Sequence, residues 1–237
     1  MIKTVLFDLD GTLLPMDQDK FIQDYLGRMA AFLAPHGYVP QLLLKAVMAG
    51  TQALVQNDGH TNNDVLFWQV FSQVLGRDAR QDADLLTQFY LGEFQQVRHS
   101  CGFDPRAAET VRSIRDMGLN TILATNPLFP AVATHSRLRW AGLEPEEFLR
   151  ITTYENSRFC KPNPDYYRQL LEEESLLPGE CLMVGNDVRE DMVAQSLGME
   201  VFLLTDCLIN TENRDLSVYP QGSFPELMAH IRRLTAQ

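Results

Sequence analysis

The chain has 237 residues, of which 45% are hydrophobic and 22% are charged, and its formal net charge is −11 at pH 7. This length suits one large domain or a domain with a sizeable insertion, and the composition is that of a globular protein. The negative charge disfavours non-specific binding to nucleic acid or to an anionic membrane surface, although it does not exclude a small anionic substrate. Two early aspartates interrupt any signal peptide, and no apolar run approaches the roughly 20 residues of a membrane helix. We therefore expect a cytoplasmic protein with neither a membrane nor a nucleic-acid partner.

The first apolar segment of the chain, VLFDLDGTLL at residues 5–14, carries two carboxylates. It predicts a buried strand that ends at Asp8 and Asp10. Two like charges at the mouth of a buried strand are costly without a partner of opposite charge. The segment therefore indicates that something cationic binds at this strand end.

The next segment, residues 16–100, has apolar side chains at helical spacing and almost no strand-like runs. Gly37, Gly76 and the polar stretch 56–63 separate three or four helices. The aromatic or titratable residues of the type that could line a substrate pocket here are Tyr25, His36, His60, Phe67, Trp68 and Arg98. Aromatic residues at helical spacing are more often core, so none of these is predicted to be catalytic.

From residue 101 onward, helical segments alternate with short apolar runs. The predicted strands are TILAT at 121–125, RITTY at 150–154, CLMVG at 181–185 and VFLLTD at 201–206. Near-continuous apolar strands between helices are typical of a parallel sheet covered on both faces. The sequence thus predicts an α/β fold, with a doubly wound, Rossmann-like core of residues 1–15 and 101–237 and an inserted α-helical cap of residues 16–100.

Polar residues gather at the predicted carboxyl ends of the strands, where ligands bind in an open parallel sheet. Together with a lysine that precedes one helix, they are Asp8, Asp10, Thr125, Asn126, Lys161, Asn186, Asp187 and Asp191. Two like charges 4 Å apart repel by about 4 kcal/mol at an effective dielectric constant of 20, so a divalent cation is needed to neutralise the acids. Oxygen ligands suit Mg²⁺ rather than zinc, which leaves Lys161 and Thr125 to hold an anion.

Four motifs carry a resemblance to a known family: FDLDGTLL at 7–14, LATN at 123–126, KPNPDYY at 161–167 and VGNDVREDM at 184–192. With these motifs in this order, the sequence resembles the haloacid-dehalogenase-like (HAD) superfamily, in the phosphatase branch with a helical cap after the first motif. The resemblance implies a magnesium-dependent phosphatase that hydrolyses a small phosphorylated metabolite through an aspartyl-phosphate.

The resemblance also implies a role for each catalytic position. Asp8 would be the nucleophile, and Asp10 would protonate the leaving oxygen and later take a proton from the attacking water. Thr125 and the backbone amide of Asn126 would hold the phosphoryl group, and Lys161 would offset charge on the nucleophile and on that group. The family's dehalogenases lack an acid at the position of Asp10, so its presence favours phosphate esters.

The metal ligands implied by the resemblance are Asp8, Asp10 through its backbone carbonyl, and Asp187. Asp191 would not bind the metal directly; it would contact the ligands of the metal or reach the metal through a water molecule. Asn186 stands where some relatives have an acid. It could contact the metal through its amide oxygen, and a hydrogen-bonding role within a turn is about as consistent with the sequence.

Two other functions remain open from the sequence. A phosphotransferase such as a phosphomutase would return the phosphoryl group to a substrate instead of water. A non-enzymatic receiver-like domain also collects acids and a lysine at strand ends, but it needs no acid at Asp10 and no cap. We expect a monomer or a weak homodimer.

Overall fold

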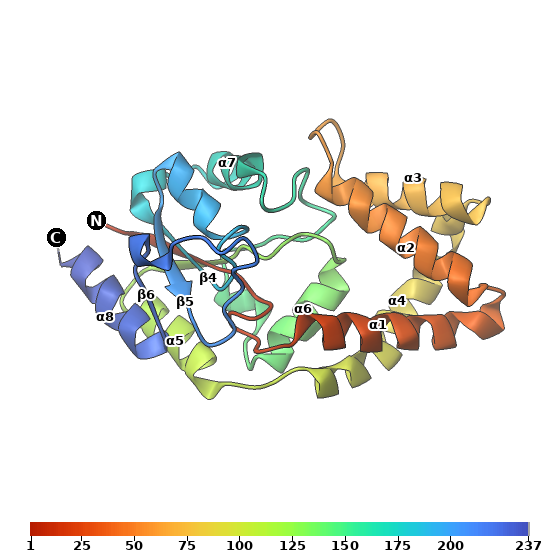
Figure 1. The fold of residues 1–237 in the computed structure, drawn as a ribbon, viewed down its shortest axis with the longest axis horizontal. Helices are drawn as coiled ribbons and strands as arrows, with labels where there is room; N and C mark the ends of the chain where they lie inside the picture. The colour runs from red at the N-terminus through yellow and green to blue at the C-terminus, as the bar shows by residue number, and fades with distance from the viewer. Residues whose placement is uncertain (237) are drawn as a thin grey trace.

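A computed structural model describes residues 1–236, which form an α/β half and an all-helical half (Figure 1). One sheet has the strand order β3-β2-β1-β4-β5-β6, and every neighbouring pair is parallel. The strands are β1 (Thr4–Phe7), β2 (Asn120–Leu123), β3 (Arg150–Ile151), β4 (Cys181–Gly185), β5 (Glu200–Leu204) and β6 (Gln221–Gly222). The first strand therefore lies in the middle of the sheet, between strands that come more than 100 residues later.

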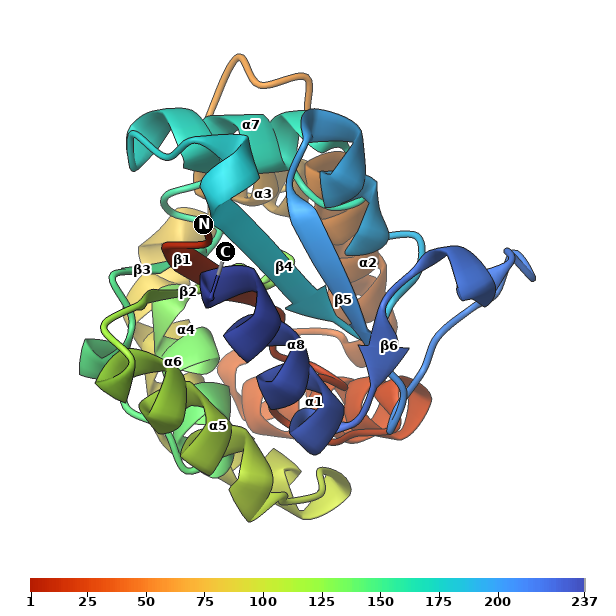
Figure 2. The ribbon, with the colours of Figure 1, turned by 90° about the vertical axis from the view of Figure 1, so that its left-hand side faces the viewer.

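Helices cover both faces of this sheet, with α7 on one side and α5, α6 and α8 on the other (Figure 2). Their bounds are α5 (Pro105–Asp116), α6 (Ala131–Trp140), α7 (Pro164–Glu173) and α8 (Phe224–Thr235). Successive side chains of a strand point to opposite faces, so Val5 and Phe7 pack on one layer while Leu6 packs on the other. This arrangement confirms the predicted doubly wound fold.

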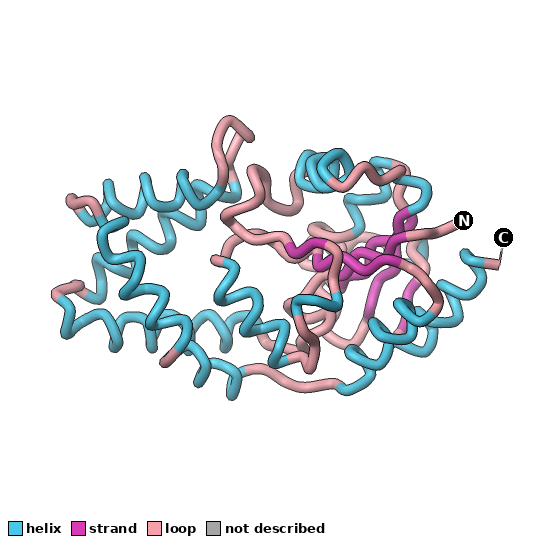
Figure 3. The backbone as a smooth tube through the Cα atoms, turned by 180° about the vertical axis from the view of Figure 1, so that it is seen from behind, coloured by secondary structure: helices cyan, strands magenta, loops and turns pink. Residues whose placement is uncertain are grey.

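The helical half is formed by residues 18–100, which contain helices and turns but no strand (Figure 3). Its α-helices are α1 (Gln18–Leu33), α2 (Pro40–Val55), α3 (Asn63–Leu75) and α4 (Ala83–Leu91). Where the chain enters and leaves this half, Met16 and Cys101 form an antiparallel bridge, and the Gly102 amide donates to the Pro15 carbonyl at 2.7 Å. The two connections thus run side by side, which lets the helical half, hereafter the cap, sit on the core as an insertion.

Short 3-10 helices complete the described chain. They are Ala34–His36, Ala79–Asp82, Glu93–Ser100, Pro145–Glu147, Pro178–Glu180, Met192–Leu197 and Leu216–Val218. No helix within residues 1–236 is both long enough and apolar enough to cross a bilayer.

Several predicted bounds differ from the structure, and β2 and β5 end at Leu123 and Leu204, two residues before the ends of the predicted strands. The strand predicted at 150–154 pairs only at Arg150 and Ile151, because the Thr152 hydroxyl turns inward to bond the carbonyls of β2 and the residues after it. The sequence after the strand at 181–185 also predicts that Asp191 lies in the first turn of a helix. The element there is a 3-10 helix, Met192–Leu197, and Asp191 is its N-terminal flanking residue.

Candidate active site

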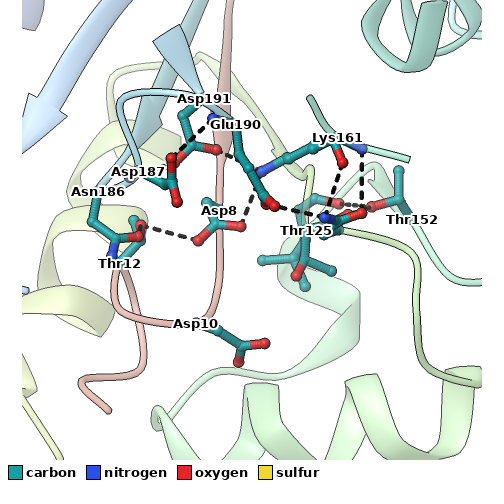
Figure 4. Close-up of polar contacts among 12 residues, drawn as sticks. Asp8, Asp10, Thr12, Thr125, Thr152, Lys161, Asn186, Asp187, Glu190 and Asp191 are labelled. Carbon is teal, nitrogen blue, oxygen red and sulfur yellow. Dashed lines mark hydrogen bonds and ion pairs between the residues drawn. The ribbon is translucent and has the colours of Figure 1, made fainter. Parts of the chain in front are cut away.

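A buried lysine between two carboxylates lies at the carboxyl end of the central strand (Figure 4). The Lys161 Nζ atom lies 3.0 Å from Oδ1 of Asp8 and 2.7 Å from Oδ1 of Asp191. The side chain of Lys161 is fully buried, and that of Asp191 is 1% exposed. Three motifs far apart in the sequence therefore meet in one charge cluster.

The electrostatics of this cluster follow from burial and pairing. Burial lowers the pKa of Lys161, but the negative charges of Asp191 and Asp8 outweigh it and hold that pKa well above the usual value. Burial raises the pKa of Asp191 to about 6, although the Lys161 charge opposes the shift. The lysine therefore stays charged and compensates the acids beside it.

Two glycines leave room for polar side chains of the last motif. A Cβ atom on Gly11, whose φ is +85°, would lie 2.3 Å from the Asn186 amide nitrogen. A Cβ atom on Gly185 would lie 2.0 Å from a carboxylate oxygen of Asp191. A side chain at position 11 would therefore push the first motif away from Asn186, and a side chain at position 185 would displace the Asp191 carboxylate within the last motif.

Two of the residues predicted to hold the phosphoryl group, Thr125 and Asn126, line the same cavity as the acids. Thr125 is 2% exposed, and its carbonyl accepts hydrogen bonds from Thr152 Oγ1 at 2.7 Å and Tyr166 Oη at 3.0 Å. The Asn126 side chain bonds the backbone of Lys161 at both ends, with its amide nitrogen 3.3 Å from the carbonyl and its oxygen 3.2 Å from the amide. Lys161 itself does not line the cavity. It would therefore act on an anion there indirectly, through its ion pair with Asp8.

The last motif is held by hydrogen bonds. Asn186 accepts from Thr12 Oγ1 at 2.9 Å and donates to the Cys207 carbonyl at 2.7 Å, so its amide links the first and last motifs. Oδ1 of Asp187 accepts from the backbone amides of Arg189 at 2.7 Å and Glu190 at 3.0 Å. This orients the Asp187 side chain on the cavity wall beside Asp8 and Asp10.

An arginine that the sequence analysis did not single out holds Asp10. Arg137, on α6, is fully buried and donates from Nη1 to Oδ2 of Asp10, and its guanidinium lies 4.2 Å from the centre of the Phe129 ring. Burial raises the pKa of Asp10, while the Arg137 charge works in the opposite direction. The only signal in the sequence was an arginine within the short helix after LATN, which reads as an ordinary surface position.

A second residue missed from the sequence is Glu190. Its carboxylate accepts from the Asn126 side chain at 3.0 Å, and burial raises the pKa of Glu190 to about 8. Glu190 thereby joins the last motif to the phosphoryl-binding motif. Nothing in the sequence distinguishes Glu190, which lies between Arg189 and Asp191, from an ordinary exposed acid.

The donor set of this cavity fits a hard divalent cation. Its acidic lining groups are Asp8, Asp10, Asp187, Glu190 and Asp191, and all their donor atoms are oxygens. Oδ1 of Asp10 is buried and has no hydrogen-bond partner. Within residues 1–236, no three His, Cys, Asp or Glu side chains are already gathered closely enough to enclose an ion. The cavity thus has the oxygen donors that such a cation prefers, but its side chains do not yet surround an ion.

The fold and this cavity together define a class of protein, a parallel-sheet α/β protein with an inserted helical cap and an acid-lined cavity at the strand ends, where open parallel sheets bind their ligands. The chain belongs to the haloacid dehalogenase-like hydrolase family, whose model matches residues 2–197. This membership confirms the resemblance carried by the four motifs and the expectation of an enzyme.

Individual relatives show how widely the family has diverged. A phosphoglycolate phosphatase from Vibrio vulnificus is 26% identical over 209 residues, which cover 86% of this chain and 84% of the relative. The structure of a HAD phosphatase from Thermococcus onnurineus superposes with a TM-score of 0.60 at 20% identity and covers 97% of this chain and 98% of that one. An L-2-haloacid dehalogenase from Xanthobacter autotrophicus superposes with a TM-score of 0.57 at 16% identity, covering 98% and 99%. One of these two structural neighbours is named a phosphatase and the other a dehalogenase, so the fold alone does not determine which reaction is catalysed.

Proposed function

We propose that this enzyme is a magnesium-dependent phosphatase that hydrolyses a small phosphorylated metabolite through an aspartyl-phosphate on Asp8. The observation that carries the proposal is the placement of Asp8 and Asp10 in one cavity, with Lys161 on the first and Arg137 on the second. A dehalogenase needs no acid at the second position, whereas expulsion of an alkoxide from phosphorus does. The phosphatase names of relatives agree with this choice.

In the first half of the reaction, a carboxylate oxygen of Asp8 forms a bond to phosphorus, and the bond from phosphorus to the ester oxygen breaks. Asp10 gives its proton to that departing oxygen, so the leaving group departs as an alcohol. Thr125 and the Asn126 backbone amide hold the phosphoryl oxygens while Lys161 keeps Asp8 in place.

In the second half, water attacks the phosphorus of the aspartyl-phosphate, and Asp10 takes the proton that the water loses. The bond from phosphorus to Asp8 breaks, which regenerates the carboxylate and releases inorganic phosphate. Mg²⁺, held by Asp8, the Asp10 backbone carbonyl and Asp187, would neutralise charge on the phosphoryl oxygens when bound. Asp191 acts on this set through Lys161 and through its bond to the Asp187 amide at 3.0 Å.

The test is a panel of phosphorylated metabolites, phosphoglycolate among them, assayed for phosphate release with Mg²⁺ and after treatment with a chelator. We expect phosphate release that disappears with chelation and returns with Mg²⁺. Isomerisation of a sugar phosphate with little phosphate release would instead identify a phosphomutase. A long-lived phosphorylated Asp8 without turnover would identify a receiver-like phosphoacceptor.

A further inference from the structure

A second cavity, of about 430 Å³, lies between the cap and the core. Helices α1 to α4 of the cap each contribute to its wall, and the core closes it with residues 128–130, 132 and 154–155. Its volume falls within the range of about 300–1,000 Å³ that is typical of small-molecule sites. The cavity is therefore large enough to hold much more than the phosphoryl group of a substrate.

Hydrogen bonds between the cap and the core hold this cavity in shape. The amides of Asn63 and Asp64, at the start of α3, donate to the carbonyls of Ser157 and Tyr154, each at 2.9 Å. The buried side chain of Asn63 also reaches Cys160 Sγ at 3.4 Å, directly before the lysine of the active site. The cavity wall is thus fixed to the same core segment that supplies Lys161.

The second cavity adjoins the acid-lined one. Ile22, Leu128 and Phe129 line both of them. A phosphate ester seated on Asp8 can therefore extend past these three side chains into the space beneath the cap. This continuity makes the leaving group of the substrate the natural occupant of the second cavity.

The chemistry of the second cavity is apolar. Within residues 1–236, no lysine, arginine or histidine lines it, and Glu155 is the one charged residue that does. The Glu155 carboxylate is already bonded by the Ala131 amide, at 3.0 and 3.1 Å, and the Tyr25 and Tyr90 hydroxyls bond each other at 2.9 Å. An anionic leaving group would lose its hydration here without gaining a cation.

We propose that the preferred substrates are phosphate monoesters with an uncharged, largely apolar alkyl or aryl leaving group, which this cavity holds. The proposal rests on the proposed phosphatase function and narrows it. It predicts discrimination against leaving groups that carry a carboxylate, such as that of phosphoglycolate, because burial of an unpaired carboxylate beside Glu155 is unfavourable.

A series of ethyl, butyl and hexyl phosphate tests the proposal directly. Each buried methylene is expected to raise kcat/KM about three- to fourfold, so hexyl phosphate should exceed ethyl phosphate by about 100-fold. Phosphoglycolate should be at least about tenfold worse than ethyl phosphate. Equal kcat/KM along the series, or a preference for phosphoglycolate, would overturn the apolar assignment and leave the phosphatase proposal intact.

A matched pair of variants on α2 locates the effect. Thr51 lines the cavity, and its neighbour Gln52 is exposed and does not. Thr51→Phe fills part of the space and should lower the ratio of kcat/KM for hexyl phosphate to that for ethyl phosphate at least tenfold, whereas Gln52→Phe should keep the ratio. If the ratio is the same in both variants, the leaving group lies elsewhere.

Binding without turnover separates failure of this inference from failure of the proposed function. Ethyl-, butyl- and hexylphosphonate carry no ester bond, and their affinity for the full-length protein with Mg²⁺ can be measured by titration calorimetry. We expect affinity to rise with chain length and the heat-capacity change to become more negative. If no ester is hydrolysed but this trend holds, the phosphatase proposal fails and the apolar site stands. If the affinities are equal, the site itself is refuted.

Discussion

The two cavities beneath the cap share a wall but differ in the forces that shape them. The cavity at the strand ends, of about 130 Å³, is lined by four aspartates and Glu190, whereas the larger cavity beneath the cap is almost entirely apolar. Charges in the first are tolerated because three of the aspartates have a cationic partner: Lys161 lies against Asp8 and Asp191, and Arg137 lies against Asp10. Side chains in the second are held by hydrophobic packing around space that a ligand can fill.

The difference teaches that the reaction and the choice of substrate are assigned to separate parts of this chain. In the function and the substrate class that we propose, the core supplies a fixed arrangement of charges for phosphoryl transfer, and the cap supplies a shape and a polarity for the rest of the substrate. Substitutions in the two regions should therefore have different signatures, and the following experiments use that difference, from the largest expected effect to the smallest.

Replacement of the nucleophile should have the largest effect. Asp8→Asn should lower kcat by about 10⁴-fold or more for every ester, whatever its leaving group, because no aspartyl-phosphate can form. Phosphate release is the measurement, and circular dichroism should show an unchanged fold. Asp116→Asn, at an exposed position on α5, is the control. Substantial activity in Asp8→Asn would remove the proposed nucleophile.

Loss of the buried lysine should affect both stability and activity. Lys161→Met leaves Asp8 and Asp191 without their cation and should lower the free energy of unfolding by about 3–5 kcal/mol in urea titrations. Lys3→Met, which breaks the exposed pair with Glu180, should change it by no more than about 1 kcal/mol. Equal effects in the two variants would contradict a buried, mutually dependent cluster.

The arginine behind Asp10 should act by positioning that acid. Arg137→Lys keeps the charge but not the planar guanidinium, and we expect kcat to fall about 10–100-fold with little change in KM. The loss should be smaller for 4-nitrophenyl phosphate than for ethyl phosphate, since a good leaving group needs less help from a proton donor.

Arg139→Lys, two residues further along α6 and half exposed, is the control for this experiment. It should retain activity within about twofold of the parent protein, as surface substitutions usually do. A loss in Arg137→Lys that is equal for both leaving groups would point to a general structural role instead.

The smallest expected signal is spectroscopic and concerns the cap alone. The chain has two tryptophans, of which Trp68 lines the apolar cavity and Trp140 packs against Phe94 with ring centres 5.1 Å apart. In a Trp140→Phe protein, hexylphosphonate should shift the Trp68 emission to shorter wavelength as water leaves its ring, whereas inorganic phosphate should not. A shift of equal size with phosphate would mean that the two cavities respond as one.

Much of the core and its site could be predicted from the sequence because the signals are local. Asp8 directly follows the central strand β1, and Asp187 and Asn126 come two and three residues after the ends of β4 and β2. Parallel strands align their carboxyl ends, so residues more than 100 positions apart were expected to meet, and the structure brings them into one cavity. Their catalytic and metal-binding roles, like the cap boundaries at residues 16 and 100, stay predictions.

The cap shows where this reasoning stops. Tyr25, Phe67 and Trp68 all line the apolar cavity, although aromatic residues at helical spacing are more often core. His36, His60 and Arg98, which have similar chemical promise in the sequence, are exposed and do not line it. Helical periodicity identifies the face that is buried, but it does not say whether that face meets another helix or an open space.

By itself, the sequence determined the fold class and the acids that converge at the strand ends, because the alternation of apolar strands with helices, and the polar residues after each strand, are local patterns. Only the tertiary structure decided that Arg137 would lie against Asp10, 127 residues away in the chain, and that four helices would leave an apolar cavity beside the acids. The reason is physical: side-chain contacts between separate elements depend on how helices are rotated and packed, and this is fixed by the sum of many weak contacts across the whole molecule.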